Sequence, residues 1–325
     1  MTRALITGIT GQDGSFLADY LRAKGNYQVF GMVRPRATGF SIDNLSHETR
    51  EQMTFVMGDM SDAASLTAVL ASAQPDEIYN LAAMSFVPMS WRMAEMTMQV
   101  NALGPVALWE AARGICPKAR IYQASTSEMF GNVPAPQNED SPMLPASPYG
   151  VAKLAAHRMA DVFRDTYGLF IVSGILFNHE SERRGQNFLT RKVALAVAQI
   201  ALGASSGVAL GNLGASRDWG FAGDYVDAMW RMLQLDEPQD FVIGTGETHT
   251  VGEFVEKAFA IIGKDYRDYV YQDPGLLRPT DVNMLRADWS KAFNVLGWSP
   301  TRTFDWLVKR MVEHELRLAG VEGWK

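Results

Sequence analysis

The sequence predicts an α/β protein with a doubly wound parallel sheet and a smaller C-terminal lobe for substrate. Three observations support this. Short apolar segments alternate with helical patterns, which is typical of parallel strands joined by helical crossovers. A glycine-rich turn follows the first apolar segment, and polar residues gather at segment ends in the last third of the chain. We therefore expect the ligand site beyond the carboxyl ends of the strands.

The first predicted strand, 3–7, leads into the run Gly8-Ile9-Thr10-Gly11-Gln12-Asp13-Gly14, and helical spacing follows over 15–24. Glycines at 8, 11 and 14 allow a ligand to approach the backbone closely, and the helix N-terminus would face a pyrophosphate. An ordinary strand–helix turn is the alternative. Because the triplet lies between the first strand and the first helix, the position favours a Rossmann-type dinucleotide site.

The second predicted strand, 28–33, ends in Arg34-Pro35-Arg36 and carries no carboxylate there. Many NAD-binding proteins place an acidic residue at this point to bond the ribose hydroxyl. Two guanidiniums suit a 2′-phosphate instead. The sequence therefore favours NADP over NAD, the alternative being a solvated basic loop.

The remaining N-terminal strands also end in small or polar residues. A third strand at 55–57 ends at Gly58-Asp59-Met60, and a fourth at 78–81 leads into Ala82-Ala83-Met84-Ser85. Small residues at such an end let the ribose and phosphates of a cofactor lie against the backbone. A helix over 100–112 is expected to be mostly core, before a fifth strand at 120–124.

The fifth strand is expected to open into a loop at Ser125, where Thr126 offers a hydroxyl and Glu128 a carboxylate. A helix then begins near residue 148, because Ser147 can cap it and Pro148 suits its first turn.

Tyr149 and Lys153 are four residues apart and share one face of this helix. An ammonium beside a tyrosine favours the phenolate and lowers the pKa of the phenol from about 10 towards neutrality. Such a tyrosine can exchange a proton with a sugar hydroxyl. The spacing alone is common, so the catalytic interpretation depends on the glycine turn and the Ser/Thr/Glu loop that precede it.

Basic residues recur at segment ends after a predicted strand at 170–176. Asn187 is expected to cap a helix carrying Lys192, and Asp224 to start another. The basic residues that can converge on a diphosphate are Arg184, Lys192, Arg217 and Arg278. Each alone could be a surface charge, but as a set after the Tyr/Lys helix they suggest a nucleotide-sugar site. Helices over 251–262 and 304–318 have amphipathic spacing typical of packing.

We expect residues 1–170 to form the NADP-binding domain, with later segments returning to the sheet, and residues 171–325 to form mainly the nucleotide-sugar lobe. Hydrophobic residues make up 47% of the 325, enough for a sizeable core without disulfides.

Charge and residue usage exclude several classes. A net charge of -6 argues against a nucleic-acid or acidic-membrane binder, and no apolar run is long enough to span a bilayer. Cys116 is the only cysteine, which fits a reducing compartment, and we expect a cytoplasmic protein. No metal is predicted, because the five histidines lack metal-ligand spacing.

Eight motifs together make the chain resemble the GDP-mannose 4,6-dehydratases of the extended short-chain dehydrogenase/reductase family along nearly its whole length. They are TGITGQDG at 7–14, YQASTSEMFG at 122–131, SPYGVAK at 147–153, GILFNHES at 174–181, TRK at 190–192, LGN at 210–212, RDWGF at 217–221 and RPTDV at 278–282. The resemblance implies a Rossmann-type fold, bound NADP and a GDP-linked hexose as substrate.

Site residues follow from the resemblance and the patterns above. The catalytic group is expected to be Thr126, Glu128, Tyr149 and Lys153. The expected NADP contacts are Gly8, Ile9, Thr10, Gly11, Gln12, Asp13, Arg34, Asp59, Met60, Leu81, Ala82, Ala83, Met84, Ser85, Lys153, His179 and Arg184. The expected GDP-sugar contacts are Ser85, Thr126, Glu128, Tyr149, Asn178, Lys192, Leu210, Asn212, Arg217 and Arg278.

The implied chemistry begins with Tyr149 taking the C4 hydroxyl proton while a hydride leaves C4 for NADP. The C4 ketone acidifies the C5 proton, which Glu128 removes. Water leaves from C6 with a proton from the same carboxyl group, and the hydride returns to C6. Members of the family that only reduce or epimerise generally lack an acid at the position of Glu128.

Some positions depart from the pattern of the family. Met84 stands where glutamine is usual, Ala146 where arginine is usual, and Pro35-Arg36-Ala37 where a second arginine and serines are common. A homodimer or homotetramer is expected. The alternatives are a dehydratase of a related GDP-sugar such as GDP-manno-heptose, a GDP-4-keto-6-deoxyhexose reductase, and a catalytically silent NADP-sensing protein.

Overall fold

The computed structural model describes residues 1–34 and 42–324, and a seven-stranded sheet forms its centre. In spatial order the strands are β11 (Phe241–Ile243), β6 (Ile171–Leu176), β5 (Arg120–Thr126), β4 (Glu77–Asn80), β1 (Thr2–Thr7), β2 (Tyr27–Val33) and β3 (Thr54–Met57). All neighbouring strands in this sheet are parallel. The predicted doubly wound parallel sheet is therefore confirmed, and the strand order reverses between β1 and β4, where such sheets bind ligands.

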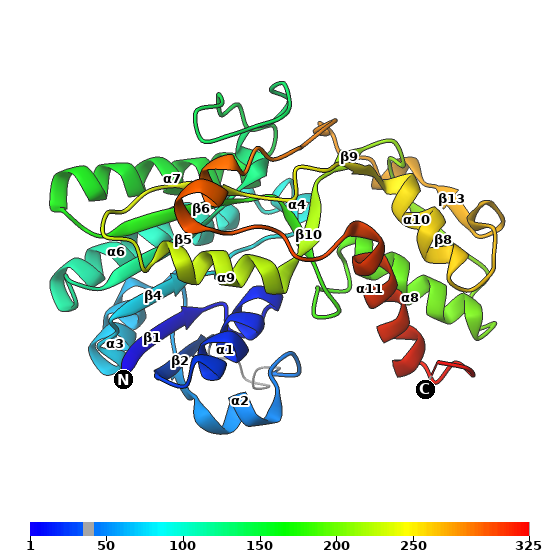
Figure 1. The fold of residues 1–325 in the computed structure, drawn as a ribbon. Helices are drawn as coiled ribbons and strands as arrows, with labels where there is room; N and C mark the ends of the chain where they lie inside the picture. Colours follow the sequence, from blue (N-terminus) through cyan, green and yellow to red (C-terminus); the bar gives the residue numbers. More distant parts are fainter. Residues whose placement is uncertain (35–41, 325) are drawn as a thin grey trace.

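Helices cover both faces of the sheet (Figure 1). One face packs against α1 (Gln12–Lys24) and α9 (Ala222–Met232), and α2 (His47–Gln52) lies beside α1. The other face packs against α3 (Ala63–Ala73), α6 (Gly104–Ile115) and α7 (Pro148–Tyr167). Two buried apolar layers thus enclose the sheet, so its strands are hydrophobic on both sides.

A second core forms the C-terminal lobe beside the sheet (Figure 1). It is built from α8 (Leu189–Ala201), α10 (Val251–Ala260) and α11 (Phe304–Leu318), with β8 (Val208–Leu210) paired to β13 (Val270–Gln272). Segments that follow residue 170 return to the large sheet as β6, α9 and β11. The division of the chain at 170–171 stays a prediction.

The remaining elements are short. They are α4 (Val87–Ser90), α5 (Ala94–Met98), a π-helical turn η1 (Gln99–Leu103), η2 (Ser127–Met129), β7 (Asn178–Glu180), β9 (Ser216–Arg217), β10 (Trp219–Phe221), β12 (His249–Thr250), η3 (Tyr266–Asp268), η4 (Pro274–Leu276) and η5 (Ala292–Leu296). Several of them lie at the carboxyl ends of strands, so they surround the ligand side of the sheet.

Several local expectations are corrected. The first helix begins at Gln12 rather than at residue 15, because Gly14 fits against the turn where a Cβ would lie 2.5 Å from the Gly8 carbonyl oxygen. The helix expected over 100–112 begins as the π-helical turn η1 and becomes α-helical only at Gly104. The fifth strand continues to Thr126, because β6 pairs with it to that residue.

The caps of the later helices also differ in part from expectation. Ser147 caps α7 as predicted, accepting a hydrogen bond from the Gly150 backbone N at 3.1 Å. Asn187 does not cap α8; the cap position is Phe188, whose own N–H bonds the Gly185 carbonyl, and Asn187 lines the cavity described below. Helix α9 begins at Ala222, two residues before Asp224.

Among the described residues, no helix is long and apolar enough to cross a membrane.

Candidate active site

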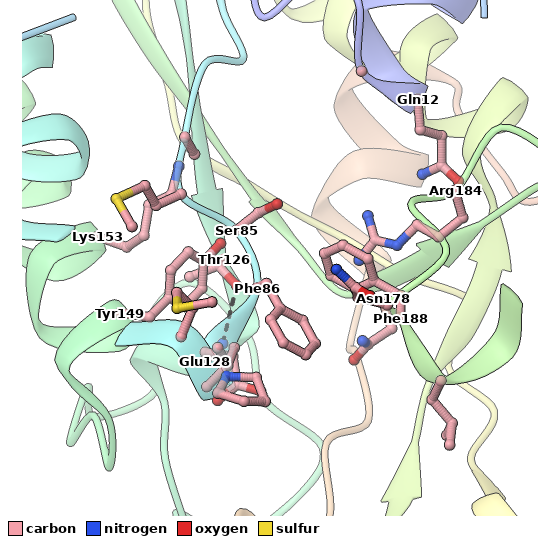
Figure 2. A pocket seen from close by; sticks show the side chains of 18 of the residues that line it. Gln12, Ser85, Phe86, Thr126, Glu128, Tyr149, Lys153, Asn178, Arg184 and Phe188 are labelled. Atoms are coloured by element: carbon pink, nitrogen blue, oxygen red, sulfur yellow. Dashed lines mark hydrogen bonds between the residues drawn. The ribbon is translucent and has the colours of Figure 1, made fainter. Parts of the chain in front are cut away.

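A cavity of about 1000 Å³ lies beyond the carboxyl ends of β1, β4 and β5 and reaches the C-terminal lobe. Figure 2 shows some of the side chains that line it. Every residue predicted above to contact cofactor or substrate lines this cavity, apart from Ile9. The side chain of Ile9 is fully buried and lies against Gly31 on β2, so it supports the glycine turn from behind.

The glycine turn is shaped to accept another molecule against its backbone. Gly8 has φ +68°, and a Cβ there would lie 2.9 Å from the Ala82 backbone N. The hydroxyl of Thr7 accepts hydrogen bonds from the N–H groups of Leu81 and Ala82, both at 3.0 Å. The ends of β1 and β4 are therefore held together without a side chain between them, which is the geometry that a phosphate-binding turn requires.

Asp13 at the start of α1 pairs with His179 on β7 across the mouth of the turn. The Nε2 atom of His179 lies 2.8 Å from Asp13 Oδ2, and its Nδ1 atom lies 2.8 Å from the Phe177 carbonyl oxygen. Burial opposes ionisation of both groups, but their attraction lowers the pKa of Asp13 to about 2 and raises the pKa of His179. The amide of Gln12 donates to the His179 carbonyl at 3.0 Å, so the turn and β7 form one unit.

Three of the expected NADP contacts follow strands β2 and β3. Arg34 is exposed at the end of β2, and Asp59 and Met60 follow β3. Partial burial favours the acid form of Asp59, but hydrogen bonds from the backbone and hydroxyl of Ser61 lower its pKa. The second predicted guanidinium, Arg36, lies outside the described residues with the rest of the loop at 35–37.

The predicted catalytic group comes from two adjacent elements. Thr126 ends β5, and its hydroxyl caps η2, accepting from the Glu128 backbone N at 3.3 Å. Tyr149 and Lys153 lie one turn apart on α7, and both line the cavity together with Glu128 (Figure 2). All four side chains are buried, so water has little access to them.

The prediction that an ammonium lowers the pKa of Tyr149 is wrong for the protein described here. Burial raises the pKa of this phenol to about 12; a hydrogen bond from Thr126 opposes the rise, and the charge of Glu128 adds to it. The ammonium of Lys153 donates to the Ala124 carbonyl at 2.8 Å. Burial lowers the pKa of Lys153 itself to about 8. Desolvation is thus the largest cause of both pKa shifts.

The pKa of Lys153 predicts a dependence of stability on pH. Between about pH 8 and pH 10.5 the Lys153 side chain is protonated in the unfolded chain but not in the folded chain. The free energy of unfolding therefore rises with pH in that window. A Lys153→Met variant lacks this term, so its stability relative to the native protein should fall as pH rises from 8 to about 10. Urea unfolding at several pH values measures this. A difference that stays constant would contradict it, and Lys309→Met on the surface of α11 serves as the control.

The predicted basic set surrounds the other half of the cavity. The Nζ atom of Lys192 donates to the Ala209 carbonyl at 2.7 Å, and Arg217 donates to the Val282 carbonyl at 2.7 Å. Arg278 Nη1 lies 3.3 Å from Glu128 Oε1, so one basic residue reaches the predicted catalytic carboxylate.

Arg184 and Arg217 also have carboxylate partners. Arg184 pairs with Glu180 at 3.2 Å, and Arg217 pairs with Asp281 at 3.2 Å. These side chains are held in place around a common space, unlike solvated surface charges.

Sequence reasoning missed several residues that line the cavity. Phe86 and Phe188 are N-cap residues of α4 and α8, Asn187 precedes α8, and Asp281 holds Arg217. The signal for Phe86 was its position directly after the predicted contact at Ser85. Within the described residues, no group of three or more His, Cys, Asp or Glu side chains could hold a metal ion.

The fold and the glycine-turn cavity are those of a Rossmann-type protein of the short-chain dehydrogenase/reductase class. The model of the GDP-mannose 4,6 dehydratase family matches residues 5–311. The chain therefore belongs to the GDP-mannose 4,6 dehydratase family.

Individual relatives agree with this assignment. The chain is 47% identical to GDP-mannose 4,6 dehydratase 1 of Arabidopsis thaliana, with 97% of this chain and 90% of that one covered. It is 46% identical to the GDP-mannose 4,6 dehydratase of Homo sapiens, with 97% and 91% covered. Among solved structures, a Thermus thermophilus UDP-glucose 4-epimerase in complex with NAD has a TM-score of 0.82 at 26% identity, covering 97% of this chain and 99% of that one.

Proposed function

We propose that this protein is a GDP-mannose 4,6-dehydratase that converts GDP-D-mannose to GDP-4-keto-6-deoxy-D-mannose and water. The observation that carries the proposal is the presence of Glu128 in the same cavity as Thr126, Tyr149 and Lys153. An enzyme that only oxidises or reduces a sugar carbon has no need of a carboxylate there, whereas elimination of water needs a base and an acid. The names of the relatives support the same substrate.

The cavity fits a nicotinamide dinucleotide, because the glycine turn and the start of α1 line it, and the absence of a side chain at Gly8 lets the turn pack closely against the Ala82 backbone. When bound, NADP would accept a hydride from C4 of the sugar and return it to C6. In this proposal the residues carried over from the family hold it: the turn at 8–13, Asp59 and Met60, the loop at 81–85, Lys153, His179 and Arg184. The cofactor ends as it began.

The protein residues then move the protons. Tyr149, oriented by Thr126 and Lys153, takes the C4 hydroxyl proton as the phenolate. Burial favours the neutral phenol, and the positive charge of an oxidised nicotinamide would favour the phenolate that this step needs. Glu128 takes the C5 proton and gives a proton to the C6 hydroxyl, which leaves as water. Tyr149 then returns its proton to C5, so that atoms and charges balance. Arg217 and Arg278, with Lys192, would hold the diphosphate.

The test is an incubation of the purified protein with GDP-mannose and no added cofactor, read by mass spectrometry. Loss of one water from the nucleotide sugar is the expected result. A GDP-4-keto-6-deoxyhexose reductase and a silent NADP-binding protein would both leave GDP-mannose unchanged, and that result would overturn the proposal. A second incubation with GDP-4-keto-6-deoxymannose and added NADPH separates these two, because only the reductase would consume the NADPH.

We propose NADP rather than NAD as the cofactor, on the evidence of Arg34 and of the missing carboxylate at the end of β2. Removing one guanidinium from a phosphate contact costs about a factor of ten in affinity. The Arg34→Ala variant should therefore bind NADP about 10-fold more weakly while its affinity for NAD is unchanged. Tryptophan fluorescence titrations with both dinucleotides measure this. Equal weakening for both would show that Arg34 does not read the 2′-phosphate.

A homodimer or homotetramer and a cytoplasmic location complete the proposal. Two exposed apolar side chains near α5 that do not line the cavity, Met93 and Leu103, support self-association.

A further inference from the structure

Two phenylalanine rings meet inside the cavity, one from each lobe. The ring centroids of Phe86, before α4, and Phe188, before α8, are 5.5 Å apart with an angle of 72° between the planes. This is the edge-to-face geometry that aromatic pairs prefer. The guanidinium carbon of Arg184 lies 3.7 Å from the centroid of Phe188. A continuous contact of three side chains therefore crosses the cavity.

The backbone behind Phe86 is held by a buried amide. Asn101, in the π-helical turn η1, accepts from the Met84 N–H at 2.8 Å and donates to the Met84 carbonyl at 3.0 Å. Val87, the next residue after Phe86, is buried. Segments of π-helix often occur at functional sites. The loop that carries Phe86 is thus anchored on both sides of the ring.

The backbone at Phe188 is equally well held. Its N–H donates to the Gly185 carbonyl at 3.0 Å, and its own carbonyl accepts from the Lys192 N–H at 2.8 Å. Because both backbones are fixed, a ligand that separates the rings must turn a side chain away from its contact. We call the two rings, Phe86 and Phe188, the wall; their fixed backbones hold it in one place in the cavity.

Both rings line the same cavity as Thr126 and Glu128. In Figure 2, Phe86 projects into the space between Thr126 and Glu128 on one side and Phe188 and Asn178 on the other. In the proposed function Glu128 acts on C5 and C6 of the sugar. The substituent on C5 that extends past Glu128 would then meet the ring of Phe86.

We propose that Phe86, backed by Phe188, determines specificity at C6, admitting the hydroxymethyl group of a hexose and excluding the longer side chain of a heptose; this rests on the proposed function. A heptose carries one further carbon with a hydroxyl at this point. To fit, it would displace the Phe86 ring from Phe188 and place a hydroxyl against apolar carbon. One extra group in a shaped pocket typically changes kcat/KM by about 10- to 200-fold.

The experiment compares GDP-mannose and GDP-manno-heptose as substrates of the holoenzyme and of Phe86→Ala. The native protein should favour GDP-mannose by at least about 10-fold in kcat/KM, and the variant should shift the ratio towards the heptose by at least about 10-fold. Phe86→Leu, which keeps apolar bulk without the ring, should give an intermediate ratio, and it carries the test if Phe86→Ala does not fold. Phe293→Ala changes an exposed phenylalanine of η5 that does not line the cavity, and it should leave the ratio unchanged.

Two results would overturn the inference alone: a native protein that uses both sugars equally or prefers the heptose, or folded Phe86 variants with the native ratio. A native protein that dehydrates neither sugar would instead overturn the proposed function and this inference together. A shift of the same size in Phe293→Ala would show that the change in ratio is not specific to Phe86.

Discussion

The Glu128→Gln variant is expected to form the 4-keto product at least about 100-fold more slowly than the native protein, a loss typical of removing a general base. Glutamine has the size of glutamate but cannot accept the C5 proton at neutral pH. Both GDP and NADP should bind with native affinity or better, because Arg278, 3.3 Å from Glu128, then loses a competing anion. Product is measured by mass spectrometry and nucleotide binding by calorimetry.

The step that fails is also predicted. Glu128 acts after C4 is oxidised, so a single turnover of Glu128→Gln should still show NADPH absorbance, which should then persist. Glu95→Gln, an exposed carboxylate on α5 away from the cavity, should behave as the native protein. Near-normal turnover in Glu128→Gln would remove this residue from the mechanism.

The Tyr149→Phe variant should block the reaction one step earlier. Phenylalanine keeps the ring in its buried position but offers no oxygen to take the C4 hydroxyl proton. The expected loss is about 100- to 10,000-fold, and single turnover should show no transient NADPH absorbance. This contrasts with Glu128→Gln, in which the absorbance appears and persists.

Tyr167→Phe is the matched control for this variant, because Tyr167 ends the same helix, is 46% exposed and does not line the cavity. It should retain native turnover and the native transient. A Tyr149→Phe variant that still reduces the cofactor at a rate near the native one would assign the first proton transfer to another group. Thr126, which also lines the cavity, would then be the next residue to test.

Local patterns were sufficient for much of the fold. Periodic apolar residues and the glycine turn predicted the order of strands and helices in the parallel sheet. These patterns depend on the conformation of neighbouring residues in the chain, so they can be recognised without knowing the tertiary structure. Most of the positions that failed were helix starts, and the end of the fifth strand also differed. At Asn187 a good capping residue was present, but the turn from Gly185 to Phe188 places the cap one residue later.

The sequence likewise predicted the residues of the site but not their contacts. The sequence indicated which side chains carry the chemistry, since the motifs around Thr126, Tyr149 and Arg217 keep those residue types in order along the chain. It could not indicate which of them would touch. The ion pair between Arg278 and Glu128 joins residues 150 positions apart, and the ring contact between Phe86 and Phe188 joins two segments with no shared pattern.

The raised pKa of Tyr149 shows why contacts could not be predicted from the sequence. From the chain alone, a lysine four residues along a helix predicts attraction and a lowered pKa, and this is sound for an exposed helix. Folding buries both groups and directs the ammonium to the Ala124 carbonyl, so desolvation raises the pKa of the phenol instead. Residue types and their spacing were thus readable from the chain. Burial, partner choice and the shape of the cavity depend on segments far apart in sequence, and only their packing sets them.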